Sequence, residues 1–145
     1  MTDGCIFCAI AAGAAEASVV RDDGDVLAFM DIAPANPGHV LVIPRTHAVG
    51  LRDLDAAAGA RVWTVAHAVA RALRTSGLRC EGVNLFLADG AVAGQEVFHV
   101  HLHVIPRFAG DGVVIRADKR PRDRAELDDH ATAVRNALPA NATGQ

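Results

Sequence analysis

Three histidines occupy every second position of an otherwise apolar stretch, residues 97 to 105. They are His99, His101 and His103, and the residues between and after them are Val100, Leu102 and Val104. Because successive side chains of an extended strand point to opposite faces, the pattern predicts a strand with the imidazoles on one face and a buried opposite face. Such a row can bind a metal ion through alternate rings, or one imidazole can attack an electrophile while its neighbours manage charge and protons. Both kinds of chemistry remain open at this point.

Two cysteines, Cys5 and Cys8, lie three positions apart near the amino terminus. This spacing can direct two sulfurs towards one metal ion, but it also occurs in redox sites and in segments without any special role. No thioredoxin-like strand pattern precedes the pair, which weakens the redox interpretation. The third cysteine, Cys80, is expected to be a small buried apolar residue. Three cysteines without a recognisable secretory signal argue against a disulfide framework.

Five strands and three helices are expected to position these residues. The strands are expected at residues 18–21, 26–31, 39–43, 82–87 and 98–105, and the helices at 5–12, 53–76 and 122–138. Residues 22–25 have the composition of a hairpin turn, and Asp53 is expected to cap the long helix. The pattern predicts an α+β fold with an antiparallel five-stranded sheet, one long helix, a short N-terminal helix and a C-terminal helix.

Length and composition limit the classes of protein to consider. The 145 residues predict a single domain spanning 1–145, with a polar tail from about residue 139 that is expected to be disordered. The formal net charge is −3, and no basic cluster is dense enough for a nucleic-acid surface. No apolar run approaches the roughly 18–20 residues of a membrane span. We therefore expect a cytoplasmic protein without nucleic-acid or membrane partners.

The stretch from Val97 to Ile105 resembles the signature of the histidine triad family, His-φ-His-φ-His-φ-φ, in which φ is apolar. Further matches are Cys5-Ile6-Phe7-Cys8, Phe29-Met30-Asp31-Ile32, the run from Gly38 to Arg45, Ala93-Gly94-Gln95 and Pro106-Arg107. The matches run in order from residue 5 to about residue 116, which is most of the chain. A single His-x-His would be weak evidence, whereas this combination is specific, and it implies the HIT-like version of the α+β fold.

The family resemblance implies nucleotidyl transfer or hydrolysis at the α-phosphate of a nucleotide. His101 is the implied nucleophile, which forms a nucleotidyl-histidine intermediate that water then hydrolyses. A neutral imidazole can attack only through an unprotonated nitrogen, so the other nitrogen must donate, and a backbone carbonyl of the same strand is expected to accept. His103 is implied to hydrogen-bond a phosphate oxygen, His39 to orient the triad and Gln95 to donate near the leaving group. His99 completes the implied catalytic set.

The same resemblance implies a purine nucleotide as substrate. Asp31 corresponds to the acidic residue that accepts hydrogen bonds from ribose hydroxyls. The base is implied to lie among apolar side chains, and the glycine before Gln95 to allow close backbone approach to the phosphate. The implied substrate-binding set is Asp31, Ile6, Phe7, Ile10, Phe29, Ile32, Gly94, Gln95, Val97, His101 and His103.

Bacterial members of the family with this opening also imply a structural zinc ion and a symmetric homodimer. The zinc ligands map to Cys5, Cys8, His47 and His99, all of which are present. A closed site with four protein ligands leaves no position for a reactive water, so zinc would hold the fold and take no part in the chemical step.

Two positions depart from the phosphoramidase branch of the family. Ala88 stands where that branch has a polar amide residue, and Glu96 stands where serine is common. The leading expectation is a histidine triad nucleotide hydrolase that cleaves adenosine phosphoramidate or a dinucleoside polyphosphate, with a phosphorylase as a variant. The alternatives are a zinc- and nucleotide-binding interaction protein with little turnover, and a metallohydrolase that uses the histidine row around a catalytic metal.

Overall fold

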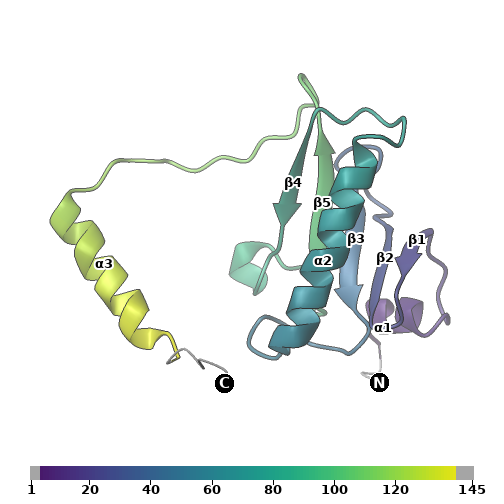
Figure 1. Cartoon of the computed structure of the whole chain (residues 1–145), viewed down its shortest axis with the longest axis horizontal. Helices are drawn as coiled ribbons and strands as arrows, with labels where there is room; N and C mark the ends of the chain where they lie inside the picture. The colour runs from purple at the N-terminus through teal and green to yellow at the C-terminus, as the bar shows by residue number, and fades with distance from the viewer. Residues whose placement is uncertain (1–3, 140–145) are drawn as a thin grey trace. The chain divides into compact units, whose positions relative to one another are not determined.

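The structure is a computed structural model that describes residues 4–139. The chain divides into two compact units, of which the first ends at Val113 and the second begins at Val114. The first unit holds the sheet, α1 and α2, and the second holds α3 (Figure 1).

The first unit contains a mixed sequence of helices and strands. In chain order these are α1 (Ile6–Ala11), β1 (Val19–Asp22), β2 (Val26–Met30), β3 (Val40–Pro44), α2 (Ala56–Leu73), β4 (Gly82–Phe86), a 3₁₀ turn η1 (Ala91–Ala93) and β5 (Leu102–Arg107). The strands form an antiparallel five-stranded sheet in the order β1-β2-β3-β5-β4. The predicted α+β fold is therefore confirmed.

One face of this sheet packs against α2, which lies lengthwise over the strands (Figure 1). Alternate residues of β2, β3 and β5 enter this core together with one stripe of α2, because side chains alternate along a strand and return to the same helix face every three or four residues. The buried set is Val26, Ala28, Val40, Val42, Leu102 and Val104 from the strands, and Val62, Val65, Ala66, Val69 and Leu73 from the helix.

The opposite face of the sheet carries a second, smaller core beneath α1. Phe7 of α1 packs here on the other alternate residues of β2 and β3, which are Leu27, Phe29, Leu41 and Ile43. The rings of Phe7 and Phe29 meet edge to face, with centroids 5.5 Å apart. Burial on both faces explains why β2 and β3 are almost continuously apolar, and it fixes α1 against the sheet.

The start of the long helix differs from the prediction. Asp55 caps α2 by accepting hydrogen bonds from the backbone N–H groups of Ala57 and Ala58, whereas Asp53 lies in the preceding turn and donates its own N–H to the carbonyl of Gly50. The expected cap at Asp53 was wrong because two aspartates stood within one turn of the boundary. The helix also ends at Leu73, earlier than the expected residue 76.

The predicted histidine strand is shorter than expected. β5 begins at Leu102, so His99 and His101 lie in the approach to the strand and only His103 lies within it. Before the strand, the backbone N–H of Val100 donates to the carbonyl of Ala48 in the loop after β3. The side chains nevertheless alternate between faces, because Leu102 and Val104 enter the core beneath α2 whereas His101 and His103 line the cavity on the other face. Burial itself does not alternate, since His99 and His101 are buried as well.

The loop between β2 and β3 holds two of the expected site residues. Asp31 lies just after β2 and His39 just before β3, and the backbone N–H of Asp31 donates to the carbonyl of His39. The predicted strands had included both residues at their ends. Their place in the loop leaves both side chains beside His103 of β5.

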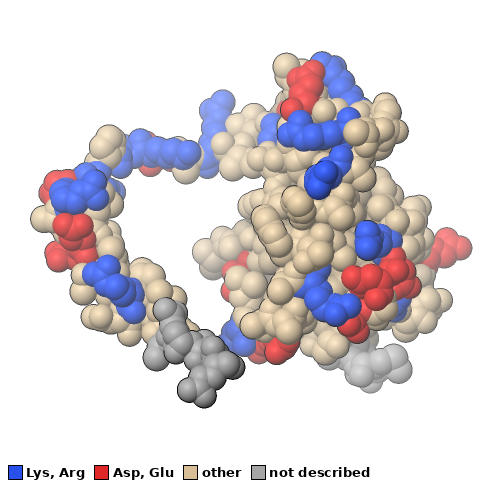
Figure 2. Space-filling view, viewed as in Figure 1, with Lys and Arg blue, Asp and Glu red and all other residues tan. Residues whose placement is uncertain are grey.

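The second unit contains α3 (Arg124–Ala137), close to the predicted helix over 122–138. Asp123 caps it by accepting from the backbone N–H of Glu126. Residues 140–145 of the predicted tail lie outside the described residues. In residues 4–139 no helix combines the length and the apolar character that crossing a membrane requires. On the face shown in Figure 2, acidic and basic side chains are interspersed.

Candidate active site and metal centre

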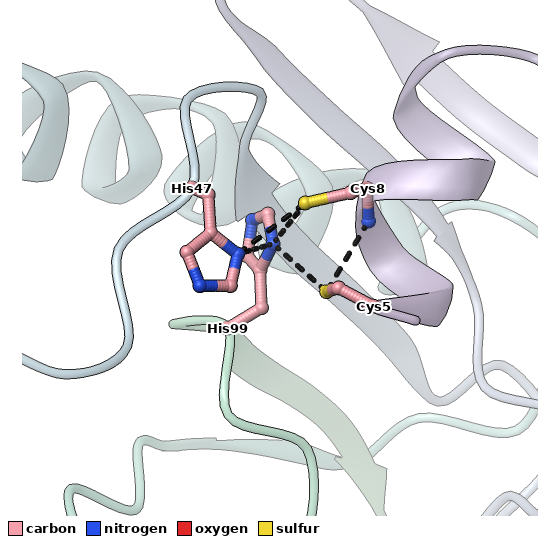
Figure 3. A group of neighbouring side chains, drawn as sticks. All are labelled: Cys5, Cys8, His47 and His99. Atoms are coloured by element: carbon pink, nitrogen blue, oxygen red, sulfur yellow. Dashed lines mark hydrogen bonds between the residues drawn. The ribbon is translucent and has the colours of Figure 1, made fainter. Parts of the chain in front are cut away.

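Four side chains converge beside α1, from three separate parts of the chain (Figure 3). Cys5 is the N-cap of α1 and Cys8 lies in its first turn, where the Cys5 sulfur accepts from the Cys8 backbone N–H. His47 comes from the loop after β3, and His99 from the approach to β5. One donor atom of each residue lies within 4.8 Å of the donor atoms of the others.

The spacing of these donor atoms fits a tetrahedral zinc ion. The two Nδ1 atoms of His47 and His99 are 3.3 Å apart, and Nδ1 of His99 lies 3.6 Å from the Cys5 sulfur and 3.5 Å from the Cys8 sulfur. A tetrahedron with ordinary zinc bonds has edges of about 3.3 Å between two nitrogens and about 3.6 Å between nitrogen and sulfur. The donor set therefore matches zinc in both chemistry and size.

His99 is also oriented from behind. Its Nε2 donates to the carbonyl of Pro44 at 2.8 Å, which leaves the lone pair of Nδ1 directed at the cysteine sulfurs. A second partner of this kind fixes the tautomer and ring orientation of metal-binding histidines. Burial lowers the pKa of His99 and so favours the neutral ring that a metal ligand requires.

His101 has one ring nitrogen engaged by the backbone. Its Nδ1 donates to the carbonyl of His99 at 2.8 Å, as the sequence had suggested for a strand carbonyl. The ring is buried and meets the ring of Phe7 edge to face at 5.2 Å. With the proton held on Nδ1, Nε2 carries the lone pair, which is the form that a nucleophilic imidazole needs.

His39 and His103 are linked in series with the backbone. Nδ1 of His39 accepts from the backbone N–H of Ala35 at 3.0 Å, so the ring proton lies on Nε2. That Nε2 lies 2.8 Å from Nδ1 of His103 and donates to it. His103 must then carry its proton on Nε2. The backbone N–H of Ala35 therefore determines, through His39, that Nε2 is the donor nitrogen of His103.

The environment keeps His103 neutral. Burial, together with the neighbouring rings of His101 and His39, lowers its pKa to about 4. Burial also lowers the pKa of His39, although the Asp31 carboxylate, 3.5 Å from its Nε2, acts in the opposite direction. At neutral pH His103 therefore presents a neutral N–H donor.

A cavity of about 910 Å³ opens over His101 and His103. Among the residues predicted to bind substrate, Ile6, Phe7, Ile10, Phe29, Asp31, Ile32, Val97, His101 and His103 line it. Gly94 and Gln95 are absent from its walls. The structure thus brings most of the predicted substrate set to one cavity, from α1, from β2 and the loop after it, and from the segment that ends in β5.

Gln95 is held inside the protein by its own loop. Its Nε2 donates to the carbonyls of Val49 and Val97, and its Oε1 accepts from the backbone N–H of Gly90. Both amide hydrogens are therefore occupied, and none is directed at a leaving group. In this structure the side chain ties the loop before the histidines to the loop after β3.

Arg45 and Arg107, the arginines that end two of the matching segments, have partners outside the cavity. Arg45 bonds the carbonyl of Ala11 and the carboxylate of Asp22. Arg107 forms a bidentate pair with Asp111. The guanidinium of Arg107 lowers the pKa of the Asp111 carboxyl, and neither arginine lines the large cavity.

Sequence reasoning missed one wall of the cavity, which consists of Glu16, Ala17 and Ser18. These residues precede β1 and belong to no motif, so their spacing gave no signal. Glu96, which the sequence marked as a departure from the family, also lines the cavity. Ala88, the other marked departure, is buried and is not part of the wall.

Comparison with known proteins agrees with this geometry. The sequence model of the HIT domain family matches residues 12–110 of this chain. An uncharacterized HIT-like protein of Borreliella burgdorferi is 46% identical over 109 residues, which cover 74% of this chain and 78% of that protein. The crystal structure of a HIT family protein from Bacillus anthracis is 34% identical, with a TM-score of 0.86 over 96% of this chain and 100% of the other.

Three more solved structures have informative descriptions. A zinc-bound histidine triad family protein from Mycobacterium smegmatis is 40% identical, with a TM-score of 0.73 over 93% of this chain and 98% of the other. A histidine triad nucleotide-binding protein from Candida albicans is 25% identical, with a TM-score of 0.82 over 92% and 96%. A HIT family hydrolase from Legionella pneumophila is 36% identical, with a TM-score of 0.61 over 70% and 90%. With its own row of histidines, matching fold and matching sequence, this chain belongs to the histidine triad (HIT) family.

Proposed function

We propose that this protein is a nucleotide hydrolase that cleaves at the α-phosphate of a purine nucleoside 5′-phosphate derivative through a covalent intermediate on His101. The observation that carries the proposal is the hydrogen bond from Nδ1 of His101 to the carbonyl of His99. It leaves the Nε2 lone pair of a buried imidazole as the nucleophile in a wall of a nucleotide-sized cavity. The nucleotide-binding protein of Candida albicans and the hydrolase of Legionella pneumophila have the same fold.

In the first step Nε2 of His101 attacks the α-phosphorus. A P–N bond to the imidazole forms, and the bond to the leaving group breaks with its electron pair on the leaving atom, which takes a proton from solvent. Nε2–H of His103 donates to a phosphate oxygen as negative charge accumulates there. In the second step water attacks phosphorus and loses one proton to solvent, the P–N bond breaks with its electron pair on Nε2, and the nucleoside monophosphate and the neutral ring are released.

The charges of the cavity favour a leaving group without extra phosphates. Glu16, Asp31 and Glu96 line it, and none of its lining residues in the described part of the chain is a lysine or arginine. A chain of phosphates would place negative charge beside these carboxylates with no cation to offset it. We therefore propose cleavage of a P–N bond, as in a phosphoramidate, in preference to the P–O–P bond of a dinucleoside polyphosphate.

Zinc is proposed as the resident metal of the Cys5, Cys8, His47 and His99 cluster. The zinc-bound relative from Mycobacterium smegmatis and the donor spacing support this assignment. When bound, zinc would contribute folding energy by joining α1 to the approach of β5. The packing of Phe7 on the sheet holds α1 in place. Ile6 and Phe7 of this helix thereby form an apolar wall of the cavity beside His101. The homodimer and the cytoplasmic location stay predictions.

The test is turnover combined with trapping of the intermediate. Adenosine 5′-phosphoramidate and diadenosine tetraphosphate are incubated in parallel with the wild-type protein, His101→Ala and the control His67→Ala, whose histidine lies exposed on α2. We expect AMP release from the phosphoramidate to be the faster. We also expect a gain of one nucleotidyl group in the mass of wild-type protein quenched in alkaline denaturant, because a P–N bond to histidine survives alkali but is hydrolysed in acid. Turnover that survives His101→Ala would overturn the covalent mechanism. Nucleotide binding without turnover of either substrate would favour the binding-protein alternative.

A further inference from the structure

The large cavity extends beyond the histidines, from β5 across β3 and β2 to the residues just before β1. A row of paired residues marks its course, from His103 on β5 to Leu41 on β3, Phe29 on β2 and Val19 on β1. Neighbouring strands lie about 4.8 Å apart, so the row spans about 14 Å. Glu16 and Ser18 line the same cavity just before β1, at the end of the row opposite His103.

The backbone fixes this distant wall. The carbonyl of Ser18 accepts from the backbone N–H of Met30 at 2.9 Å, which extends the pairing of β1 and β2 by one step. Asp31 follows Met30 directly and lines the same cavity, with a carboxylate oxygen within 4.8 Å of a ring nitrogen of His103. Within residues 4–139 the carboxylate of Glu16 makes no hydrogen bond or ion pair, and it remains exposed to the cavity and to solvent.

The proposed function sets the direction in which a nucleotide would lie. With the α-phosphate at His101 and the ribose at Asp31, the base extends along the apolar slot between α1 and Phe29. The edge of the base that is farthest from the ribose then meets Glu16 and Ser18. A carboxylate only accepts hydrogen bonds, whereas a serine hydroxyl can donate one.

Guanine complements these two side chains better than adenine. Its N1–H and N2–H₂ are adjacent donors that can meet both oxygens of a carboxylate, and its O6 beside them is an acceptor for a hydroxyl. Adenine presents an acceptor at N1 where the carboxylate also accepts, so one of the two contacts becomes repulsive. Glu16 and Ser18 together would therefore bind guanine more tightly than adenine.

We propose that Glu16 is a specificity-determining residue that selects guanine nucleotides for this site, with Ser18 as its hydroxyl partner. The inference rests on the proposed function, because it uses the position assigned there to the phosphate. It adds the identity of the base, which neither the histidine row nor the apolar wall of the slot can distinguish.

The test measures the dissociation constants of GMP, IMP and AMP by calorimetry, without turnover. The wild-type protein is expected to bind GMP roughly fivefold to tenfold more tightly than AMP. This is the lower part of the range for a side chain that makes two hydrogen bonds to one base, because Glu16 is exposed. IMP, which lacks the N2 amino group, should fall between them. Glu16→Ala should remove the preference, and Glu16→Gln should move it towards AMP, because an amide can donate to N1 and accept from N6–H₂ of adenine.

The matched control is Glu81→Gln, which removes the same charge just before β4, on the opposite edge of the sheet and outside the cavity. It should keep the wild-type preference for GMP. Equal binding of GMP and AMP by the wild-type protein, or a preference that survives Glu16→Ala, would overturn the role of Glu16 while leaving the proposed function intact. Failure of all three nucleotides to bind would overturn the proposed function itself.

Discussion

In the proposed metal cluster of Cys5, Cys8, His47 and His99, the Nδ1 atoms of the two histidines lie 3.3 Å apart, and both lie close to the Cys8 sulfur, at 3.3 and 3.5 Å. In the second cluster, formed by His39, His101 and His103, Nε2 of His39 and Nδ1 of His103 lie 2.8 Å apart. The first distance suits two ligands of one metal ion, and the second joins a donor to an acceptor. Histidine side chains thus have two different arrangements in this protein: one suits metal binding, and the other forms a hydrogen-bonded pair.

The difference originates in the backbone group behind each ring. The carbonyl of Pro44 accepts from Nε2 of His99 and so turns the Nδ1 lone pair inward to the sulfurs. The N–H of Ala35 donates to Nδ1 of His39 and so places the proton on the side that faces His103. A histidine becomes a ligand or a link in a donor chain according to which nitrogen the backbone occupies.

Removal of the His101 ring should separate the two clusters most strongly. We expect His101→Ala to lower turnover by about 10³-fold or more, because the attacking atom is lost. Zinc content, measured by atomic emission, should remain at the wild-type value because the cluster ligands are untouched. A variant that lost both zinc and turnover would show that the two clusters are not independent.

Removal of the Cys8 sulfur should affect zinc binding and stability first, in contrast to the loss of the His101 ring. Cys8→Ser should abolish stoichiometric zinc binding and lower the free energy of unfolding by about 2–4 kcal/mol, because the metal no longer joins α1 to the rest of the first unit. Chemical denaturation and zinc analysis measure the two effects. Cys80→Ser is the control, since Cys80 lies outside the cluster and bonds the carbonyl of Gly82. An equal loss of stability in both variants would contradict a structural metal.

The donor chain to His103 can be broken at His39, which is a positioning residue. We expect His39→Ala to lower kcat about 10- to 100-fold with a smaller change in KM, because His103 loses the partner that fixes its tautomer. His39→Gln should recover part of kcat, since its amide N–H can still donate to Nδ1 of His103. A glutamine variant no better than alanine would argue for a purely structural role.

The smallest expected effect concerns the pH dependence of stability. The pKa of His103 is about 4 in the folded protein and about 6.5 in the unfolded chain, so the unfolded state binds more protons between these values. The free energy of unfolding should therefore fall as pH drops from about 6.5 towards 4. After allowance for partial exposure the effect of this ring is on the order of 1 kcal/mol. His103→Asn should flatten the curve between pH 6.5 and 5, and an unchanged slope would contradict the assignment.

The resemblance anticipated the four members of the metal cluster because each had a motif position in the sequence. The structure brings these residues together at spacings that suit zinc. The alternating pattern after His99 likewise anticipated the burial of Val100, Leu102 and Val104, although it placed the start of β5 too early and did not predict that His99 and His101 are buried too. Local patterns were sufficient where burial and side-chain chemistry alone decide the outcome.

The sequence by itself therefore determined the antiparallel α+β fold, the family and the residues that meet in its two histidine clusters. Only the tertiary structure decided which nitrogen of each ring is free, because the deciding partners are the backbone groups of Pro44 and Ala35 in distant loops. It also decided that Gln95 bonds its own loop and that Glu16 reaches the cavity. Backbone hydrogen-bonding groups are the same at nearly every residue, so no residue type reveals in advance where they will bind.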